Sequence, residues 1–87
     1  MTTKRPKILI VDDDADLLRL LAIRLEANRY GVETAESGEE AITKVSRARP
    51  DLVITDLKMD GMDGMVLLQT LQREVATIPV ILMTAHG

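Results

Sequence analysis

Leu52-Val53-Ile54-Thr55-Asp56 is a short run of apolar and β-branched residues that stops on an acid. A nearly continuous run of this kind is typical of a strand that is buried on both faces of a parallel sheet. Open α/β sheets bind their ligands outside the carboxyl ends of the strands, and Asp56 falls at such an end. The segment therefore predicts a buried strand that presents a carboxylate at a ligand-binding edge.

Two other segments have the same form. Lys7-Ile8-Leu9-Ile10-Val11 leads into Asp12-Asp13-Asp14, and Val80-Ile81-Leu82-Met83 leads into Thr84. Because parallel strands end on the same edge of a sheet, the three segments would bring several carboxylates and one hydroxyl together. We expect this edge to be the functional part of the molecule.

Helical patterns separate the strand-like segments. Apolar residues at helical spacing predict helices over Ala15–Ala27, between Ser37 and Pro50, and over about Met65–Glu74. The alternating residues 32–35 predict a half-exposed edge strand. Strands that alternate with helices in this way favour right-handed parallel crossovers, so the fold class is α/β with a doubly wound parallel sheet.

Several polar residues and one glycine predict where the helices begin and end. Asp14 is placed to cap the first helix. Ser37 and Glu40 match a capping box at the second helix, in which Ser37 bonds forward and Glu40 reaches back. Gly31, after the first helix, suits a left-handed turn.

Composition excludes several classes of function. The 87 residues carry a net charge of −3, with 46% hydrophobic and 29% charged residues, and suit one small globular domain. A single aromatic residue and the acidic balance argue against nucleic-acid binding, and the absence of cysteine excludes disulfides and zinc–thiolate sites. No stretch is apolar enough for a signal or a membrane span, so we expect a cytoplasmic protein without membrane contact.

Asp12, Asp13 and Asp56 form the most informative constellation, because the strands that carry them are expected to be neighbours. Two such charges about 4 Å apart repel by roughly 4 kcal/mol at an effective dielectric of 20, so the cluster favours a bound proton or cation. Carboxylates without His or Cys suit Mg²⁺. A carboxylate beside Mg²⁺ can act as a nucleophile toward phosphorus. The competing interpretation makes these acids helix caps and turn formers, and it is favoured for Asp14, Asp51, Asp60 and Asp63.

These motifs together resemble the receiver domain of bacterial two-component response regulators. The resemblance covers the whole chain and rests on the acid run 12–14, the strand ending at Asp56, Met62-Asp63-Gly64, and Pro79 to Ala85. The Val-Asp-Asp-Asp start and the Met-Thr-Ala-His-Gly end are most similar to receivers of enhancer-binding transcription activators.

The resemblance implies a role for each site residue. Asp56 would accept a phosphoryl group from the phosphohistidine of a sensor histidine kinase. Asp12 and Asp13 would hold Mg²⁺ together with Asp56 and the backbone carbonyl of Lys58, and the Lys58 side chain would face solvent. Thr84 would be the hydroxyl that reports phosphorylation to an output, expected to be transcription regulation. The chain would then be a regulatory phosphoacceptor and not an enzyme.

The family has five strands and five helices, whereas this chain stops after the fourth strand. We therefore expect a flavodoxin-like sheet in the order 2-1-3-4 without its fifth strand and last two helices. Residues 1–6 would be a polar tail and residues 7–87 the N-terminal part of a receiver domain. The family's phosphoryl-contacting lysine lies in the missing strand, and the uncovered edge of strand 80–83 predicts self-association.

Two alternatives remain open. One is a fragment that cannot be phosphorylated without the missing lysine and serves only as a folding or association scaffold. The other is a Mg²⁺-dependent phosphohydrolase with Asp56 as nucleophile, but Leu57 and Lys58 follow Asp56 where such an enzyme would need a general acid. A glycine-rich phosphate loop after the first strand is absent, so a nucleotide-binding site is not supported.

Overall fold

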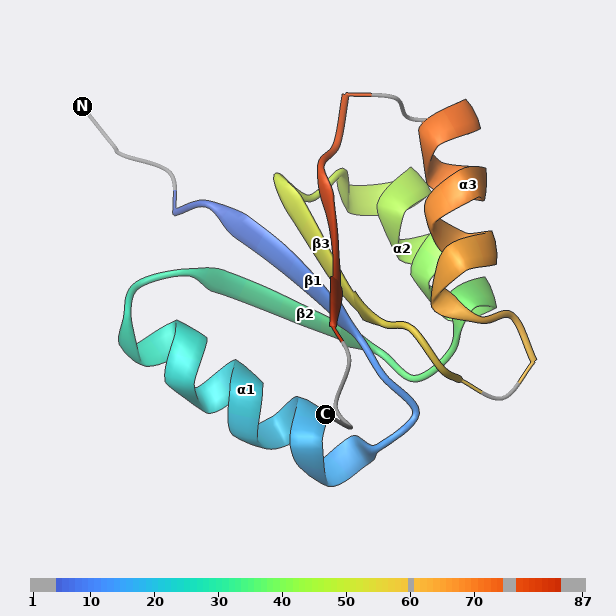
Figure 1. Ribbon diagram of the computed structural model, residues 1–87. Coiled ribbons are helices and arrows are strands. Elements are labelled where there is room, and N and C mark those ends of the chain that lie inside the picture. The colour runs from blue at the N-terminus through green and yellow to red at the C-terminus, as the bar shows by residue number, and fades with distance from the viewer. Residues whose placement is uncertain (1–4, 60, 75–76, 84–87) are drawn as a thin grey trace.

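The computed structural model describes residues 5–59, 61–74 and 77–83, which form one parallel sheet flanked by helices (Figure 1). The predicted elements are confirmed to within one residue at the ends of the strands and helices. Their bounds are β1 Lys7–Val11, α1 Ala15–Ala27, β2 Gly31–Ala35, α2 Gly38–Ala48, β3 Leu52–Asp56, α3 Gly64–Glu74 and β4 Val80–Met83.

The sheet has the predicted strand order β2-β1-β3-β4, and all three pairings are parallel. The register places Val11 opposite Thr55, so β1 and β3 end in adjacent rows and the acids that follow them meet. In the part of the chain that is described, β4 pairs only with β3 and is an edge strand.

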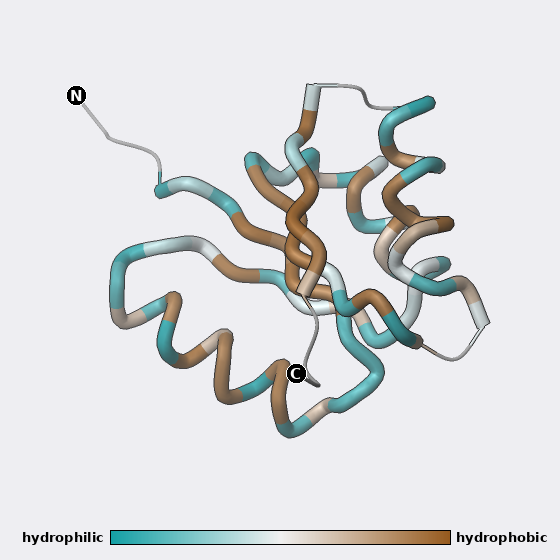
Figure 2. Tube along the Cα trace, in the orientation of Figure 1, coloured by the Kyte–Doolittle hydropathy of each residue, from teal (hydrophilic) through white to brown (hydrophobic). Residues whose placement is uncertain are grey.

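Two apolar clusters pack on opposite faces of the sheet. We call the larger one the α2/α3 core; its buried members are Leu9, Val11, Ala35, Ala41, Val45, Val53, Met59, Leu67 and Leu71. The smaller one, the α1 core, consists of Ile8, Ile10 and Leu18. Alternate residues of β1 enter opposite cores, as strand geometry requires, and Figure 2 shows the long apolar runs of the central strands that this burial on both faces needs.

The cap of α1 is confirmed, whereas the turn after it differs from the prediction. The Asp14 side chain accepts hydrogen bonds from the N–H groups of Asp16 and Leu17. Gly31 is the first residue of β2 and has no positive φ; Arg29 instead adopts the left-handed conformation, with φ of 69°. The prediction for Gly31 was wrong because the chain turns two residues earlier, directly after the helix.

Of the two hydrogen bonds of the predicted capping box at α2, the one to Ser37 is confirmed, whereas the one to Glu40 comes from a different residue. Ser37 Oγ accepts from the Glu40 N–H at 3.1 Å, while Glu40 Oε1 accepts from the N–H of Glu36 and not from that of Ser37. The bond from Glu36 lowers the pKa of Glu40, and Lys44 at 3.2 Å adds to this effect. Lys44 also donates to the carbonyl of Thr34, so the start of α2 is tied to the end of β2.

Candidate functional site

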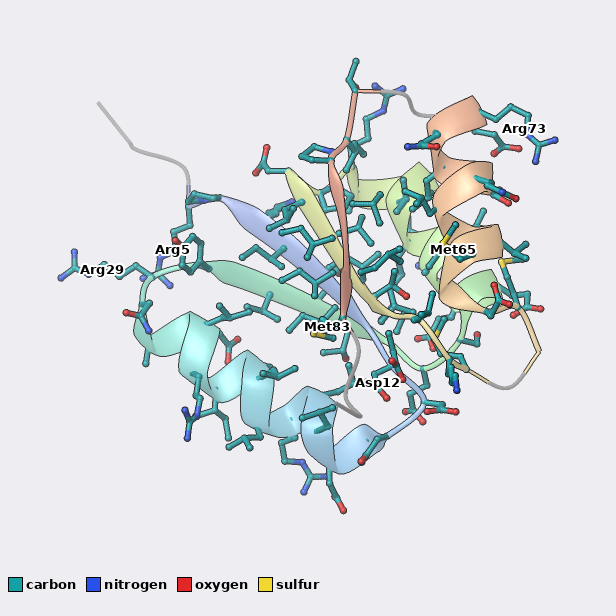
Figure 3. All side chains as sticks on the ribbon, viewed as in Figure 1. Arg5, Asp12, Arg29, Met65, Arg73 and Met83 are labelled. Atoms are coloured by element: carbon teal, nitrogen blue, oxygen red, sulfur yellow. The ribbon has the colours of Figure 1, made fainter. Side chains whose placement is uncertain are left out.

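Asp12, Asp13 and Asp56 lie together at the carboxyl edge of the sheet, as the sequence predicts. Each offers a carboxylate oxygen within 4.8 Å of the other two. Asp12 follows β1 and is held there by its own N–H, which donates to the carbonyl of Ala35 at 3.1 Å. Figure 3 shows Asp12 at the same end of the sheet as Met83, the last residue of β4.

The cluster is mostly enclosed by protein. Asp12 is 2% exposed and Asp56 is 8% exposed, whereas Asp13 is an exposed residue. Among the described residues of the cluster, Asp13 is therefore the exposed member, and a ligand approaching over Asp13 would meet the two buried carboxylates. Nucleophilic attack by Asp56 needs an opening of this kind, because a fully enclosed carboxylate could not be reached.

Burial and like charges act together on Asp12. Burial raises the pKa of its carboxyl above the ordinary value, the charges of Asp56 and Asp13 raise it further, and the Asp14 N–H, which donates at 2.9 Å, partly opposes them. The crowded charges would be relieved by a cation. Because the donor set consists of hard carboxylate oxygens, the residues present fit Mg²⁺.

Replacing Asp12 with asparagine should stabilise the metal-free chain at pH 7 by about 1 to 2 kcal/mol, because it removes one of the three crowded charges. The amide oxygen can still accept from Asp14. Folding raises the pKa of the wild-type Asp12 carboxyl. The wild type therefore gains stability as the pH falls through that raised pKa, whereas the variant does not. The difference in the free energy of unfolding between the two chains should narrow over the same pH range. Urea unfolding in EDTA at a series of pH values measures this; a variant less stable than wild type at pH 7 would contradict it.

The other two predicted site residues are placed only in part. The Lys58 side chain is exposed, as expected, and its N–H lies 3.5 Å from Asp56 Oδ1. Its carbonyl follows Asp56 closely enough in the chain to reach the site, but its role as a metal ligand stays a prediction. Thr84 lies outside the described residues, so its role as the switch hydroxyl also stays a prediction.

Two residues that support Asp56 were missed in the sequence. Thr55 is fully buried, and its hydroxyl donates to the Asp56 carbonyl at 3.1 Å. Gly64 donates its N–H to the Leu57 carbonyl at 2.9 Å, and a Cβ on Gly64 would lie 2.2 Å from the Asp56 carbonyl oxygen. This loop contains two glycines, Gly61 and Gly64, which differ in what they provide. Only Gly61 has a positive φ, of 77°, whereas Gly64 is needed for space.

The fold and the site together define a doubly wound α/β domain with a carboxylate cluster at the carboxyl edge of its sheet. Residues 8–87 match the family model of the response regulator receiver domain, so the chain belongs to that family, and the resemblance found in the sequence is confirmed. Among the residues that the structure describes, the helices are all too short or too polar to cross a membrane.

Curated relatives of this chain are transcriptional regulatory proteins. The chain is 49% identical over 87 residues to the transcriptional regulatory protein GlrR of Escherichia coli, and 44% identical over 85 residues to ResD of Bacillus subtilis. The alignments cover 100% and 98% of this chain but only 20% of GlrR and 35% of ResD. The chain therefore spans a minor part of the length of these relatives.

Solved structures of receiver proteins have the same fold. The chemotaxis protein CheY4 of Vibrio cholerae superposes with a TM-score of 0.91 at 29% identity, over 97% of this chain and 72% of that one. The response regulator TrrA of Thermotoga maritima, solved in complex with Mg²⁺ and BeF, gives a TM-score of 0.89 at 35% identity, over 94% of this chain and 71% of that one.

Proposed function

We propose that this chain is a cytoplasmic phosphoacceptor module whose Asp56 takes a phosphoryl group from the phosphohistidine of a sensor histidine kinase. The observation that carries the proposal is the cluster of Asp12, Asp13 and Asp56 within 4.8 Å, with the nucleophile 8% exposed at a strand end. The match to transcriptional regulatory proteins supports an output in transcription regulation, with no direct nucleic-acid contact by this segment.

The proposed step is a displacement at phosphorus. A carboxylate oxygen of Asp56 supplies the electron pair for the new P–O bond, and the P–N bond of the phosphohistidine breaks. The pair from that bond stays on the imidazole nitrogen, which is protonated by water. The product is an aspartyl phosphate, in which a carboxylate oxygen of Asp56 carries the phosphoryl group.

Asp12, Asp13 and Asp56, with the Lys58 carbonyl, would hold Mg²⁺ beside the nucleophile. When bound, the ion would neutralise negative charge on the transferred group, which is most of what phosphoryl transfer requires. The TrrA structure, a relative solved with Mg²⁺ and BeF, supports this assignment.

Phosphorylation would replace the single negative charge of the Asp56 carboxylate with a phosphoryl group that carries about −1.5 to −2. The change falls next to Asp12 and Asp13, which already repel each other. Thr84, the next residue in the sequence after β4, would turn its hydroxyl toward the phosphoryl oxygens and report that the site is occupied. This regulatory role, without turnover of a substrate, is favoured over a phosphohydrolase, and the scaffold without phosphorylation is the remaining alternative.

The test is the intact mass of the chain after incubation with a small acyl phosphate, with Mg²⁺ and with EDTA. We expect one added phosphoryl group with Mg²⁺ and none with EDTA, and peptide mapping should place it on Asp56. No added mass under either condition would overturn the proposal and leave the scaffold alternative. Steady release of inorganic phosphate from a phosphoester at many turnovers would favour the phosphohydrolase.

We further propose that the 87-residue chain associates with a second copy through the free edge of β4. The carbonyls of Pro79 and Met83 accept from Val53 and Leu57 on the β3 side. Because a strand alternates its backbone groups, those of Val80 and Leu82 point away from β3 and are open to pairing. The strand is wholly apolar, and Ile81 is 50% exposed.

Ile81→Lys should shift the chain toward the monomer, because a charge on an edge strand opposes pairing with another strand. Sedimentation equilibrium over a range of concentrations measures the average mass of both chains. Val66→Lys is the matched control: Val66 is 45% exposed, but it lies on helix α3 and takes no part in strand pairing. A wild-type chain that stays monomeric at every concentration would contradict the proposal, as would an equal effect of the two lysines.

A further inference from the structure

The loop from Leu57 to Asp63 joins β3 to α3 and carries the Lys58 carbonyl. Its two ends are held by backbone hydrogen bonds: the Leu57 N–H donates to the Met83 carbonyl at 3.0 Å, and the Leu57 carbonyl accepts from the Gly64 N–H at 2.9 Å. The Asp63 side chain adds a cap to α3 by accepting from the Val66 N–H at 2.9 Å. These bonds fix the ends of the loop but not its middle.

Two methionines fix the middle of the loop. Met59 is 8% exposed and belongs to the α2/α3 core, although the Lys58 side chain just before it is exposed. A buried residue directly after Lys58 restricts the peptide unit that contains the Lys58 carbonyl. The loop therefore enters the α2/α3 core directly after the Lys58 carbonyl.

The second methionine, Met62, packs on the first residue of α2. A Cβ on Gly38 would lie 2.7 Å from Met62 Sδ, 2.9 Å from Cγ and 3.0 Å from Cβ. Met62 is half-buried and packs against the α2/α3 core. In Figure 1 the first turn of α2 lies beside the loop that leads into α3. The absence of a side chain at Gly38 thus leaves the space that the Met62 side chain occupies, and a Cβ there would require Met62 to shift.

We infer that Met62, seated on Gly38, is a positioning residue for the metal site. With Met59 as the other fixed point, it holds the loop so that the Lys58 carbonyl faces Asp12, Asp13 and Asp56. The inference rests on the proposed function, since it needs a cation at the three carboxylates. It makes the start of α2, which no site prediction included, part of what sets the affinity of that site.

Gly38→Ala separates this inference from ordinary helix energetics. In the first turn of α2, alanine should favour the helix over glycine, so propensity predicts a more stable chain with unchanged metal binding. The contact between Met62 and Gly38 instead predicts weaker metal binding, because the new methyl group displaces Met62 and the loop moves with it. Loss of a group that orients a metal ligand weakens binding by about tenfold or more.

The experiment is an NMR titration of the ¹⁵N-labelled 87-residue chain with MgCl₂ alone, following the amide shifts of Asp13 and Asp56. We expect Gly38→Ala and Met62→Ala each to raise the Kd for Mg²⁺ by about tenfold. In Gly38→Ala/Met62→Ala the two Met62 atoms that the added methyl group would meet most closely, Sδ and Cγ, are gone, so the double variant should match Met62→Ala alone. Val45→Ala is the control: it removes a buried part of the same core from α2, and should lower the Tm without changing the Kd.

Each outcome of the titration either supports or overturns the inference. The inference is overturned if Gly38→Ala binds Mg²⁺ with the Kd of the wild type, or if the wild-type chain binds no Mg²⁺. It is also overturned if the effects of Gly38→Ala and Met62→Ala on the Kd are additive. An equal rise of the Kd in Val45→Ala would overturn it as well. The titration contains no phosphodonor. A chain that shows the expected pattern of Kd values but takes up no phosphoryl group therefore overturns the proposed function while supporting the positioning role of Met62.

Discussion

An Asp56→Asn chain is expected to gain no phosphoryl mass under conditions in which the wild-type chain gains one. Asparagine keeps the shape of the side chain and an oxygen facing the Lys58 N–H, which lies 3.5 Å from Asp56 Oδ1. It lacks the second carboxyl oxygen, which would attack phosphorus, so the chemistry is lost while the fold is kept. Removal of one of three crowded charges should also make the variant at least as stable as the wild type.

Asp51→Asn provides the matched control for this experiment. Asp51 is an exposed acid at the other end of β3, where its carboxylate accepts from the Lys7 N–H at 2.8 Å. We expect the Asp51 variant to be labelled as completely as the wild type, by intact mass in the presence of Mg²⁺. Labelling of the Asp56 variant to the same extent would mean that another residue accepts the phosphoryl group.

Gly64→Ala should cost about 3 kcal/mol of the free energy of unfolding. The new Cβ would lie 2.2 Å from the Asp56 carbonyl oxygen and 2.9 Å from the Leu57 Cα. Both are backbone atoms, and the hydrogen bond from Gly64 to the Leu57 carbonyl holds them in place. Relief of the contact requires the end of β3 to separate from the start of α3, so phosphorylation of Asp56 should also be impaired.

Gly61→Ala tests whether steric room or backbone angle determines how much stability is lost when a glycine of this loop is replaced with alanine. Gly61 has a φ of 77° but nothing within 4 Å of its Cβ position, so alanine there should cost only about 1 to 2 kcal/mol. Local propensity predicts the reverse order, since Gly64 lies in a helix and Gly61 in the left-handed region. Urea unfolding followed by circular dichroism gives both values. A larger loss for Gly61→Ala would show that the contact at Gly64 is relieved at little cost.

Much of the fold could be predicted because its signals are local. The apolar runs 7–11, 52–56 and 80–83 are strands, and Asp14 and Ser37 cap the helices that they precede. A strand buried on both faces needs a continuous apolar run, and a helix start needs a side-chain acceptor, so both features are written in neighbouring residues. The strand order needed the family resemblance, because pairing joins residues far apart in the chain.

The left-handed turn at Arg29 shows where local signals fail. Glycine is the usual residue for this conformation, and Gly31 was the nearest candidate. The register of β2 with β1 instead pairs Gly31 with Lys7 as part of the sheet, so the turn falls on Arg29. Pairing between strands, which no residue of the turn encodes, outweighed the preference of a single residue.

By itself, the sequence determined the type of each element, the acids Asp12, Asp13 and Asp56 at strand ends, and the family. Tertiary structure alone decided how deeply these acids are buried, and it added Thr55, Gly64 and the seat of Met62 on Gly38. The physical reason is the distance along the chain over which each interaction acts. Propensity, capping and hydrophobic pattern act over a few residues and can be read along the chain, whereas burial, charge crowding and steric room depend on atoms that only folding brings together.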